Sequence, residues 1–245
     1  MKISPFTLGW LLCAVWFSGC FGPGMLQTSL NNKRVAVGYL HDSPKAEEKL
    51  PIQITSTIVD SSGCPYSTTV VKDSGRFLYA VVFYDKKNHY TVTLGKASVE
   101  PNFPKFLRES LAGEMERSGA FLLDDSSATQ RWTPEVKVET FSSKAYYLEE
   151  GLGIPHGSVY YAQASPLGAE LSVLAQLRDE TGALQFERRY QHREVATFVR
   201  KRTSIINTLN KDLMVNLSES SATCVKVVWA DLVADLNEVL RAGRG

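Results

Sequence analysis

The sequence has little of the residue chemistry that marks a catalytic or metal site. Its four histidines are scattered, without a His-Glu-x-x-His motif or a paired Cys/His spacing, so no zinc site is predicted. It has no Gly-x-Ser-x-Gly elbow, and the glycine-rich stretch 151–157 lacks the Lys-Ser/Thr of a phosphate-binding loop. We therefore predict no catalytic residue, no bound metal or cofactor, and no enzymatic activity.

An excess of one charge and a long apolar run are missing too. Lys and Arg number 27 against 26 Asp and Glu, and this balance gives no reason to expect nucleic-acid binding. The apolar run at 3–17 holds roughly 15 residues, fewer than the ~20 that a membrane-spanning helix needs. Glycine and proline at 22–24 then interrupt the chain. A persistent transmembrane helix is not expected here.

The N-terminus instead has the profile of a secretory signal. Lys2 supplies a positive charge, the apolar run follows, and the run ends in Phe17-Ser18-Gly19-Cys20. Small residues before a cysteine fit the narrow pockets of a signal peptidase. We predict a signal peptide at 1–19 that is cleaved just before Cys20; the alternative is an ordinary signal peptide with a chance cysteine.

The tetrapeptide that ends in Cys20 resembles the lipobox of bacterial lipoproteins, with Phe17 at the place of the usual leucine-like residue. This resemblance implies that Cys20 becomes the N-terminus and carries acyl chains, palmitate among them. Two or more such chains hold a protein stably on a membrane. Because Phe21 and not Asp follows the cysteine, the sorting rule of enterobacterial lipoproteins implies the outer membrane, with the domain facing the periplasm.

Cysteine usage fits an oxidising compartment. Cys13 leaves with the signal and Cys20 takes the lipid, so Cys64 and Cys224 remain as one pair. We hypothesise that these two form a disulfide. The alternatives are two buried free thiols or a metal-binding pair.

The chain after the signal is long enough for one ordinary core. Residues 20–32 are small or polar and predict a flexible tether, and residues 33–245 predict a periplasmic domain. Alternating strands, a hairpin around 179–182 and amphipathic helices predict an α+β fold. Its sheet is expected to be mixed and largely antiparallel, with the helices on one face. The expected elements are strands at 33–40, 52–59, 76–84, 90–94, 120–123, 136–141, 170–178 and 184–193, and helices from 102 to 119, at 203–217 and at 223–240. Strand 76–84 is apolar on both faces, as in a central strand, and a polar turn is expected at 85–88. Asn102 is the expected N-cap of the first helix, and Ser220 or Ser221 that of the last.

Two surfaces are candidates for a partner. Residues 142–168 contain several glycines and prolines and predict a long loop, which we interpret as a partner-binding loop bearing Tyr146, Tyr147, Tyr160 and Tyr161. The alternative is that these tyrosines are strand ends packed on the core. The second surface is the basic stretch 188–202, for which a solvated strand face followed by a helix start is the simpler explanation.

The order of elements also resembles a known group. The helix Phe103-Pro104-Lys105-Phe106-Leu107-Arg108-Glu109-Ser110-Leu111 runs to 116–121, and strand 136–141, the 179–182 hairpin and a terminal helix follow. This pattern looks like the auxiliary lipoproteins of ABC-type envelope transport systems and YajG-like lipoproteins, which share a TolB N-terminal-like fold. The resemblance implies a non-enzymatic accessory or binding role in envelope transport or assembly, with an envelope protein as partner. Two other classes stay open: a lipoprotein regulator of a cell-wall synthase and an anchored hydrolase.

The lipid anchor gives a direct test. The substitution Cys20→Ser removes the acyl-accepting thiol, so the precursor should stay uncleaved and carry no lipid, whereas Cys13→Ser should be processed normally. Intact mass and membrane fractionation check both results. A Cys20→Ser protein that is still cleaved and still fractionates with membranes would contradict the anchor.

Overall fold

The computed structural model describes residues 23–39, 52–54, 58–80, 83–118, 122–123, 130–154, 157–195 and 201–242. Cys20 and the predicted signal peptide, residues 1–19, lie outside these ranges. The helices are α2 (Pro23–Asn31), α3 (Phe103–Arg117) and α4 (Ile206–Ala242), with a short 3-10 turn η1 (Lys96–Ser98). The strands are β1 (Val35–Ala36), β2 (Ile52–Ile54), β3 (Ile58–Asp60), β4 (Thr69–Ala80), β5 (Phe83–Thr93), β6 (Val99–Glu100), β7 (Leu122–Leu123), β8 (Gln130–Ile154), β9 (Gly157–Asp179), β10 (Leu184–Glu194) and β11 (Lys201–Thr203).

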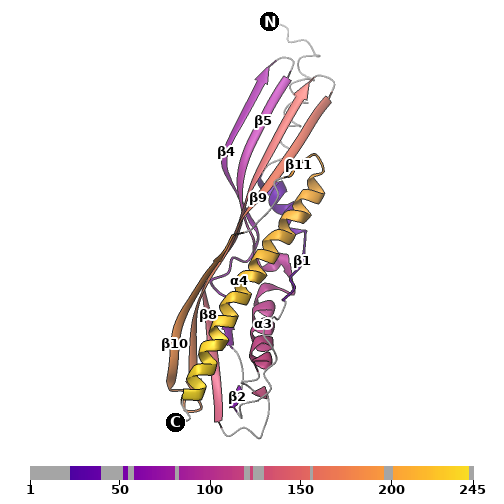
Figure 1. The fold of residues 1–245 in the computed structure, drawn as a ribbon. Coiled ribbons are helices and arrows are strands. Elements are labelled where there is room, and N and C mark those ends of the chain that lie inside the picture. The colour runs from indigo at the N-terminus through magenta and orange to yellow at the C-terminus, as the bar shows by residue number, and fades with distance from the viewer. Residues whose placement is uncertain are drawn as a thin grey trace.

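Two very long strands organise the sheet. Strands β8 and β9 pair antiparallel over their whole length, and at ~3.3 Å per residue the 25-residue β8 spans roughly 80 Å. Along one half, β10 pairs with β9 while β2 and β3 run parallel to β8. Along the other half, β5 pairs with β8 and β4 forms the edge, with β11 beside β9. Figure 1 shows α3 and α4 against one face of the sheet, with the ends of β4, β5, β8 and β9 extending beyond the start of α4.

The fold is α+β with a largely antiparallel sheet, which confirms the predicted class. Several local predictions are confirmed with it. Asn102 caps α3 and accepts a hydrogen bond from the backbone N–H of Lys105 at 3.1 Å. Alternation in β9 buries Leu171, Val173 and Ala175 against the helices.

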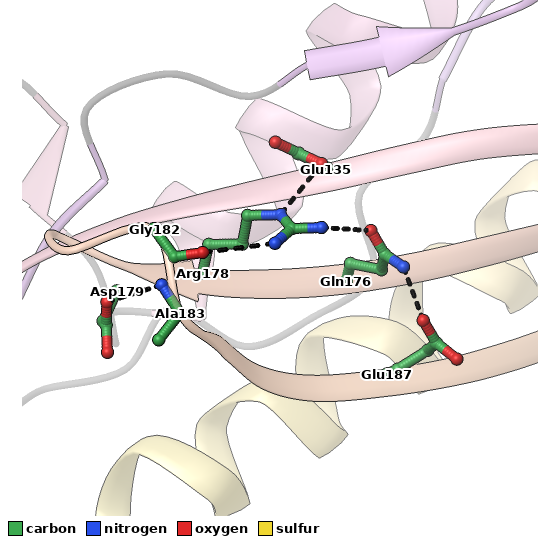
Figure 2. A network of polar contacts seen from close by, with 7 residues as sticks. All are labelled: Glu135, Gln176, Arg178, Asp179, Gly182, Ala183 and Glu187. Atoms are coloured by element: carbon green, nitrogen blue, oxygen red, sulfur yellow. Dashed lines mark hydrogen bonds and ion pairs between the residues drawn. The ribbon is translucent and has the colours of Figure 1, made fainter.

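The predicted hairpin at 179–182 is confirmed. Gly182 has a φ of +83°, a conformation that glycine adopts at no steric cost, and the Asp179 carboxylate accepts hydrogen bonds from the backbone N–H groups of Thr181 and Ala183. Figure 2 shows the polar network beside this turn, in which Arg178 reaches Glu135, Gln176 and the Gly182 carbonyl. The face of the sheet away from the helices is therefore polar at this end.

Residues 76–93 differ from the prediction. Residues 76–84 were expected to form one central strand that ends in a turn at 85–88, but 85–88 lie inside β5, which pairs with β4 as far as Phe83 opposite Ala80. The charges there pair across strands: Arg76 Nη2 lies 2.7 Å from Asp85 Oδ2, and Lys87 Nζ lies 3.1 Å from Glu150 Oε1. Because these charges are paired across strands, the polar residues 85–88 can lie inside a strand, although their sequence is typical of a turn.

The predicted loop at 142–168 is a pair of strands. Its residues lie in β8 and β9, and only 155–156 fall outside the described residues. A Cβ on Gly151 would lie 2.7 Å from Cε1 of Tyr160, and one on Gly153 would lie 1.7 Å from Cε1 of Tyr84. These glycines therefore make room for aromatic rings from neighbouring strands.

The two helices predicted at the C-terminal end are one continuous helix, α4, about 55 Å long at 1.5 Å per residue. The Ser220 hydroxyl, which was expected to cap a second helix, donates to the Asn216 carbonyl at 2.9 Å, and Ser221 donates to Leu217 at 2.6 Å. Both serines are buried against the core. These hydrogen bonds to carbonyls one turn earlier satisfy both hydroxyls, so α4 continues without a break.

The predicted flexible tether, residues 20–32, contains α2. Leu30 is fully buried, and the Asn31 side chain accepts a hydrogen bond from the backbone N–H of Thr68 at 3.1 Å. These contacts fasten α2 to the start of β4, so the domain begins at least ten residues earlier than predicted. The strand expected at 33–40 is reduced to β1, which pairs parallel with β6.

The core lies between the helices and the inner face of the sheet. Trp229 of α4 is fully buried and donates its ring N–H to the Ser110 hydroxyl of α3 at 2.9 Å. The rings of Phe103 and Phe141 join α3 to β8 with centroids 4.3 Å apart. Among the helices in the described ranges, none combines the length and apolarity that crossing a bilayer requires.

Replacing Trp229 with Ala should lower the free energy of unfolding by about 3–5 kcal/mol, because it leaves a cavity and removes the donor to the buried Ser110 oxygen. Urea denaturation measures this change. The matched control is Leu184→Ala, at a side chain that is 46% exposed, where a change within about 0.5 kcal/mol is expected. Equal effects of the two substitutions would contradict the assigned core.

Candidate binding cleft

The four tyrosines predicted to form one binding loop lie on two faces of the sheet. Tyr147 and Tyr160 face the side that the helices cover, and Tyr147 is buried. Tyr146 and Tyr161 face the opposite side and are 54% and 36% exposed. Since successive strand residues point to opposite faces, the four cannot act as one surface.

Tyr147 and Tyr160 instead belong to a cleft of about 580 Å³. It lies where α4 begins, between that helix end, α2 and the inner face of β5, β8 and β9. The lining residues are Met25, Leu26, Ser29, Tyr90, Tyr147, Glu149, Tyr160, Ser204, Ile205, Ile206, Asn207 and Asn210.

The walls of the cleft are mostly apolar. The Tyr90 and Tyr147 rings come from adjacent strands with centroids 6.4 Å apart, and both side chains are buried. Met25 and Ile205 are 54% and 63% exposed. Apolar side chains so open to solvent beside buried aromatic rings form a surface suited to an apolar group.

A carboxylate lies in the floor of the cleft. Glu149 is 7% exposed, and its Oε2 accepts hydrogen bonds from the Tyr90 hydroxyl at 3.1 Å and the Asn88 side-chain amide at 3.2 Å. Lys86 Nζ lies 3.4 Å from the same oxygen. Two hydrogen bonds and a cation compensate the burial of this charge.

The tyrosines around this carboxylate keep their protons. Burial first, and then the negative charge of Glu149, raise the pKa of Tyr90 and of Tyr147 well above the ordinary value for a phenol. The Tyr90 hydroxyl therefore stays a hydrogen-bond donor at neutral pH. The arrangement suits binding through hydrogen bonds rather than proton transfer by these phenols.

One wall of the cleft holds an acceptor that no group satisfies. Asn210 is 1% exposed and its amide nitrogen donates to the Ser29 hydroxyl at 3.0 Å. Its Oδ1 is buried and has no hydrogen-bond partner among the described residues. A buried orphan acceptor costs about 1–3 kcal/mol, which a donor group on a ligand would recover.

Most of this cleft was not predicted from the sequence. Met25 was assigned to the tether, and Glu149 to the loop. The alternation of Tyr147 with Glu149 in a strand was the available signal, but Gly151 and Gly153 concealed it. Asn210 gave no signal, because a polar residue in an amphipathic helix is ordinarily placed on the solvent side.

The basic stretch 188–202 does not form one surface among the described residues. Arg188 pairs with Asp235 of α4 at 2.7 Å. Arg189 points to the other face, where its guanidinium makes two hydrogen bonds with Glu139. Arg202 pairs with Glu150 at 3.0 Å, while Arg200 lies outside the described residues. The split between Arg188 and Arg189 agrees with strand alternation.

The predicted disulfide is not formed in the structure. Cys64 and Cys224 are both buried free thiols, which was one of the alternatives. Cys64 lies in the turn before β4, whereas Cys224 lies in α4 and donates to the carbonyl of His192 in β10 at 3.3 Å. Within the described part of the chain, no group of three His, Cys, Asp or Glu side chains is arranged to hold a metal.

Comparison with known proteins adds no family. The sequence matches no protein-family model, and no curated protein matches it. Among solved structures, the crystal structure of a Xanthomonas campestris protein of the family termed DUF330 aligns with a TM-score of 0.42 and 10% identity. The alignment covers 86% of this chain and 96% of the other. A likeness this weak defines neither the fold nor the function of the present chain.

The buried thiols give a pH-dependent prediction. Burial raises the pKa of Cys64 and of Cys224 from 9.0 to about 12. Between these values the unfolded chain loses two protons that the folded chain keeps, so the free energy of unfolding should fall as pH rises from 9 toward 12.

Urea titrations at several pH values measure this fall, with a Cys64→Ala, Cys224→Ala variant as the control. Buried tyrosines with a raised pKa also lower the free energy of unfolding above pH 10, and they do so in both proteins. The contribution of the thiols is therefore the difference between the two pH curves. The variant should show the shallower dependence. Parallel curves for the two proteins would contradict the assigned burial of the thiols.

Proposed function

We propose that this chain is a non-enzymatic lipoprotein, anchored through acylated Cys20 to the outer membrane with its domain in the periplasm. It acts as an accessory or binding component in envelope transport or assembly. The observation that carries the proposal is the cleft at the start of α4, because it joins apolar walls to a few buried polar groups. That combination is characteristic of binding sites.

The chemistry of the cleft limits what it binds. Its volume of about 580 Å³ is within the range of ligand sites. The exposed side chains of Met25 and Ile205 favour an apolar group, and the orphan oxygen of Asn210 favours a hydrogen-bond donor beside it. The partner is therefore an amphiphilic group, either a lipid of the envelope or an apolar side chain next to an amide or hydroxyl of an envelope protein.

The position of α2 also supports the proposal. This helix begins at Pro23, three residues after Cys20, and its Met25 and Leu26 line the cleft. Three residues span at most about 11 Å when fully extended. An acylated Cys20 would thus hold the cleft close to the membrane surface.

Site-specific photocross-linking in intact cells tests the function. A photoreactive residue at Ile205, on the cleft, should cross-link to an envelope component, whereas the same residue at Leu184, also exposed but remote in β10, should not. Adding Asn210→Leu, which removes the orphan acceptor, should reduce the Ile205 product several-fold while the protein remains folded. Identical products from positions 205 and 184, or no effect of Asn210→Leu, would contradict the proposal.

A further inference from the structure

Four of the exposed apolar side chains at the far end of the sheet share one face, while Phe77, which is 52% exposed, lies on the other. Leu78, Phe83, Leu152 and Val159 are 50%, 44%, 53% and 45% exposed, and we call these four the end patch. The strand register places them together: Leu152 pairs with Val159 and with Asp85, and Asp85 pairs with Leu78. The register places them near the last paired residues of β4 with β5 and of β8 with β9, on the face opposite Tyr160 and the cleft.

A belt of charged and aromatic side chains follows the end patch on the same face. Within the end patch itself, Asp85 lies in the row of Leu78 and Leu152 and is neutralised by Arg76 at 2.7 Å. Two residues further from the end of β8, Glu150 forms ion pairs with Lys87, at 3.1 Å, and with Arg202, at 3.0 Å. The Arg202 guanidinium also lies 4.6 Å from the centroid of the Tyr161 ring.

This order of side chains is that of a membrane interface. Apolar residues that enter the acyl region are followed by Tyr, Arg and Lys at the depth of the lipid headgroups, where each has an apolar body and a polar tip. The neutralised Asp85 limits the depth to the interface. If the end patch bound a protein instead, the tyrosine and the charged side chains of the belt would not lie at the depth of lipid headgroups.

The chain enters the domain at the same end. Met25 at the start of α2 lines the cleft beside Tyr160, and Tyr160 is the neighbour of Val159 in β9. The other end of α2 is fixed at Thr68, the residue before β4 begins. Cys20 precedes α2 by only three residues, so an anchor there would bring this end of the sheet to the bilayer.

We propose that the end patch inserts into the interface of the same bilayer that holds the anchor. This inference rests on the proposed function, because acylated Cys20 is what brings the patch to a membrane. The long axis of the sheet then stands away from the bilayer, and the cleft, on the opposite face of the same strands, lies just above the headgroups. The protein has two points of attachment, which fix its orientation as well as its location.

Thiol labelling of the full-length, membrane-extracted protein tests the insertion. Cys64 and Cys224 are buried and Cys20 would carry lipid, so a polarity-sensitive fluorophore would label a newly introduced cysteine. The test positions are Phe83→Cys and Leu152→Cys. Leu184→Cys is the control, because this side chain is 46% exposed at the other end of the sheet.

Each labelled protein is reconstituted into phosphatidylethanolamine–phosphatidylglycerol vesicles with and without doxyl-labelled lipid. Labels at 83 and 152 should shift to shorter emission wavelengths and be quenched about threefold more than the label at 184, as expected for an interfacial depth of roughly 5–10 Å. Equal quenching at 83, 152 and 184 would overturn the insertion. A blue shift without quenching would also overturn it, since it indicates protein contact instead of lipid.

Two measurements keep this result separate from the anchor. Intact mass of the same sample reports the acyl chains. If they are absent, the anchor proposal fails, and the same labels placed in a Cys13→Ser, Cys20→Ser background report whether the end patch meets added vesicles. Circular dichroism confirms that each variant is folded. If either test variant does not fold, Val159→Cys replaces it, because its side chain is 45% exposed in the same patch.

Discussion

The antiparallel pairing of β8 with β9 is the constraint on which the rest of the structure depends. Its register runs from Trp132 opposite Asp179 to Ile154 opposite Gly157, with two shifts near Val138 and Lys144. One half of this ladder is closed by α3 and α4 on its inner face, and β10 extends it. The other half is extended by β4 and β5 and reaches beyond the start of α4 (Figure 1). A single pair of strands therefore connects a packed core to an open sheet.

The cleft lies at the boundary between these two halves. There the strands still present buried side chains such as Tyr147, but α4 has only begun and α2 supplies the remaining wall. Glu149, the most polar element of the floor, is stabilised by side chains of β5 rather than by a helix. The unsatisfied oxygen of Asn210 reduces stability. Such a cost is expected where a protein retains polar groups for a ligand.

Local patterns predicted part of this fold. The cap at Asn102, the turn at Asp179 and the alternation of β9 all depend on neighbours in the sequence, and the structure has each of them. The failures depend on tertiary contacts. Gly151 gives space to a ring from another strand, Ser220 is buried against the core, and the charges of β5 find partners on β8. The cleft was missed for the same reason, because half of its lining residues lie in the segments that were predicted to be a tether and a loop.

Amide hydrogen exchange across residues 144–165 of the full-length protein tests the central claim most directly. If β8 and β9 pair along their entire length, the backbone amides that bond across the ladder should exchange slowly, with protection that continues from the 170–178 half into this one. Protection that stops near residue 144, with exchange beyond it as fast as in an unstructured chain, would contradict the account. The cleft floor and the end patch would then have no common scaffold.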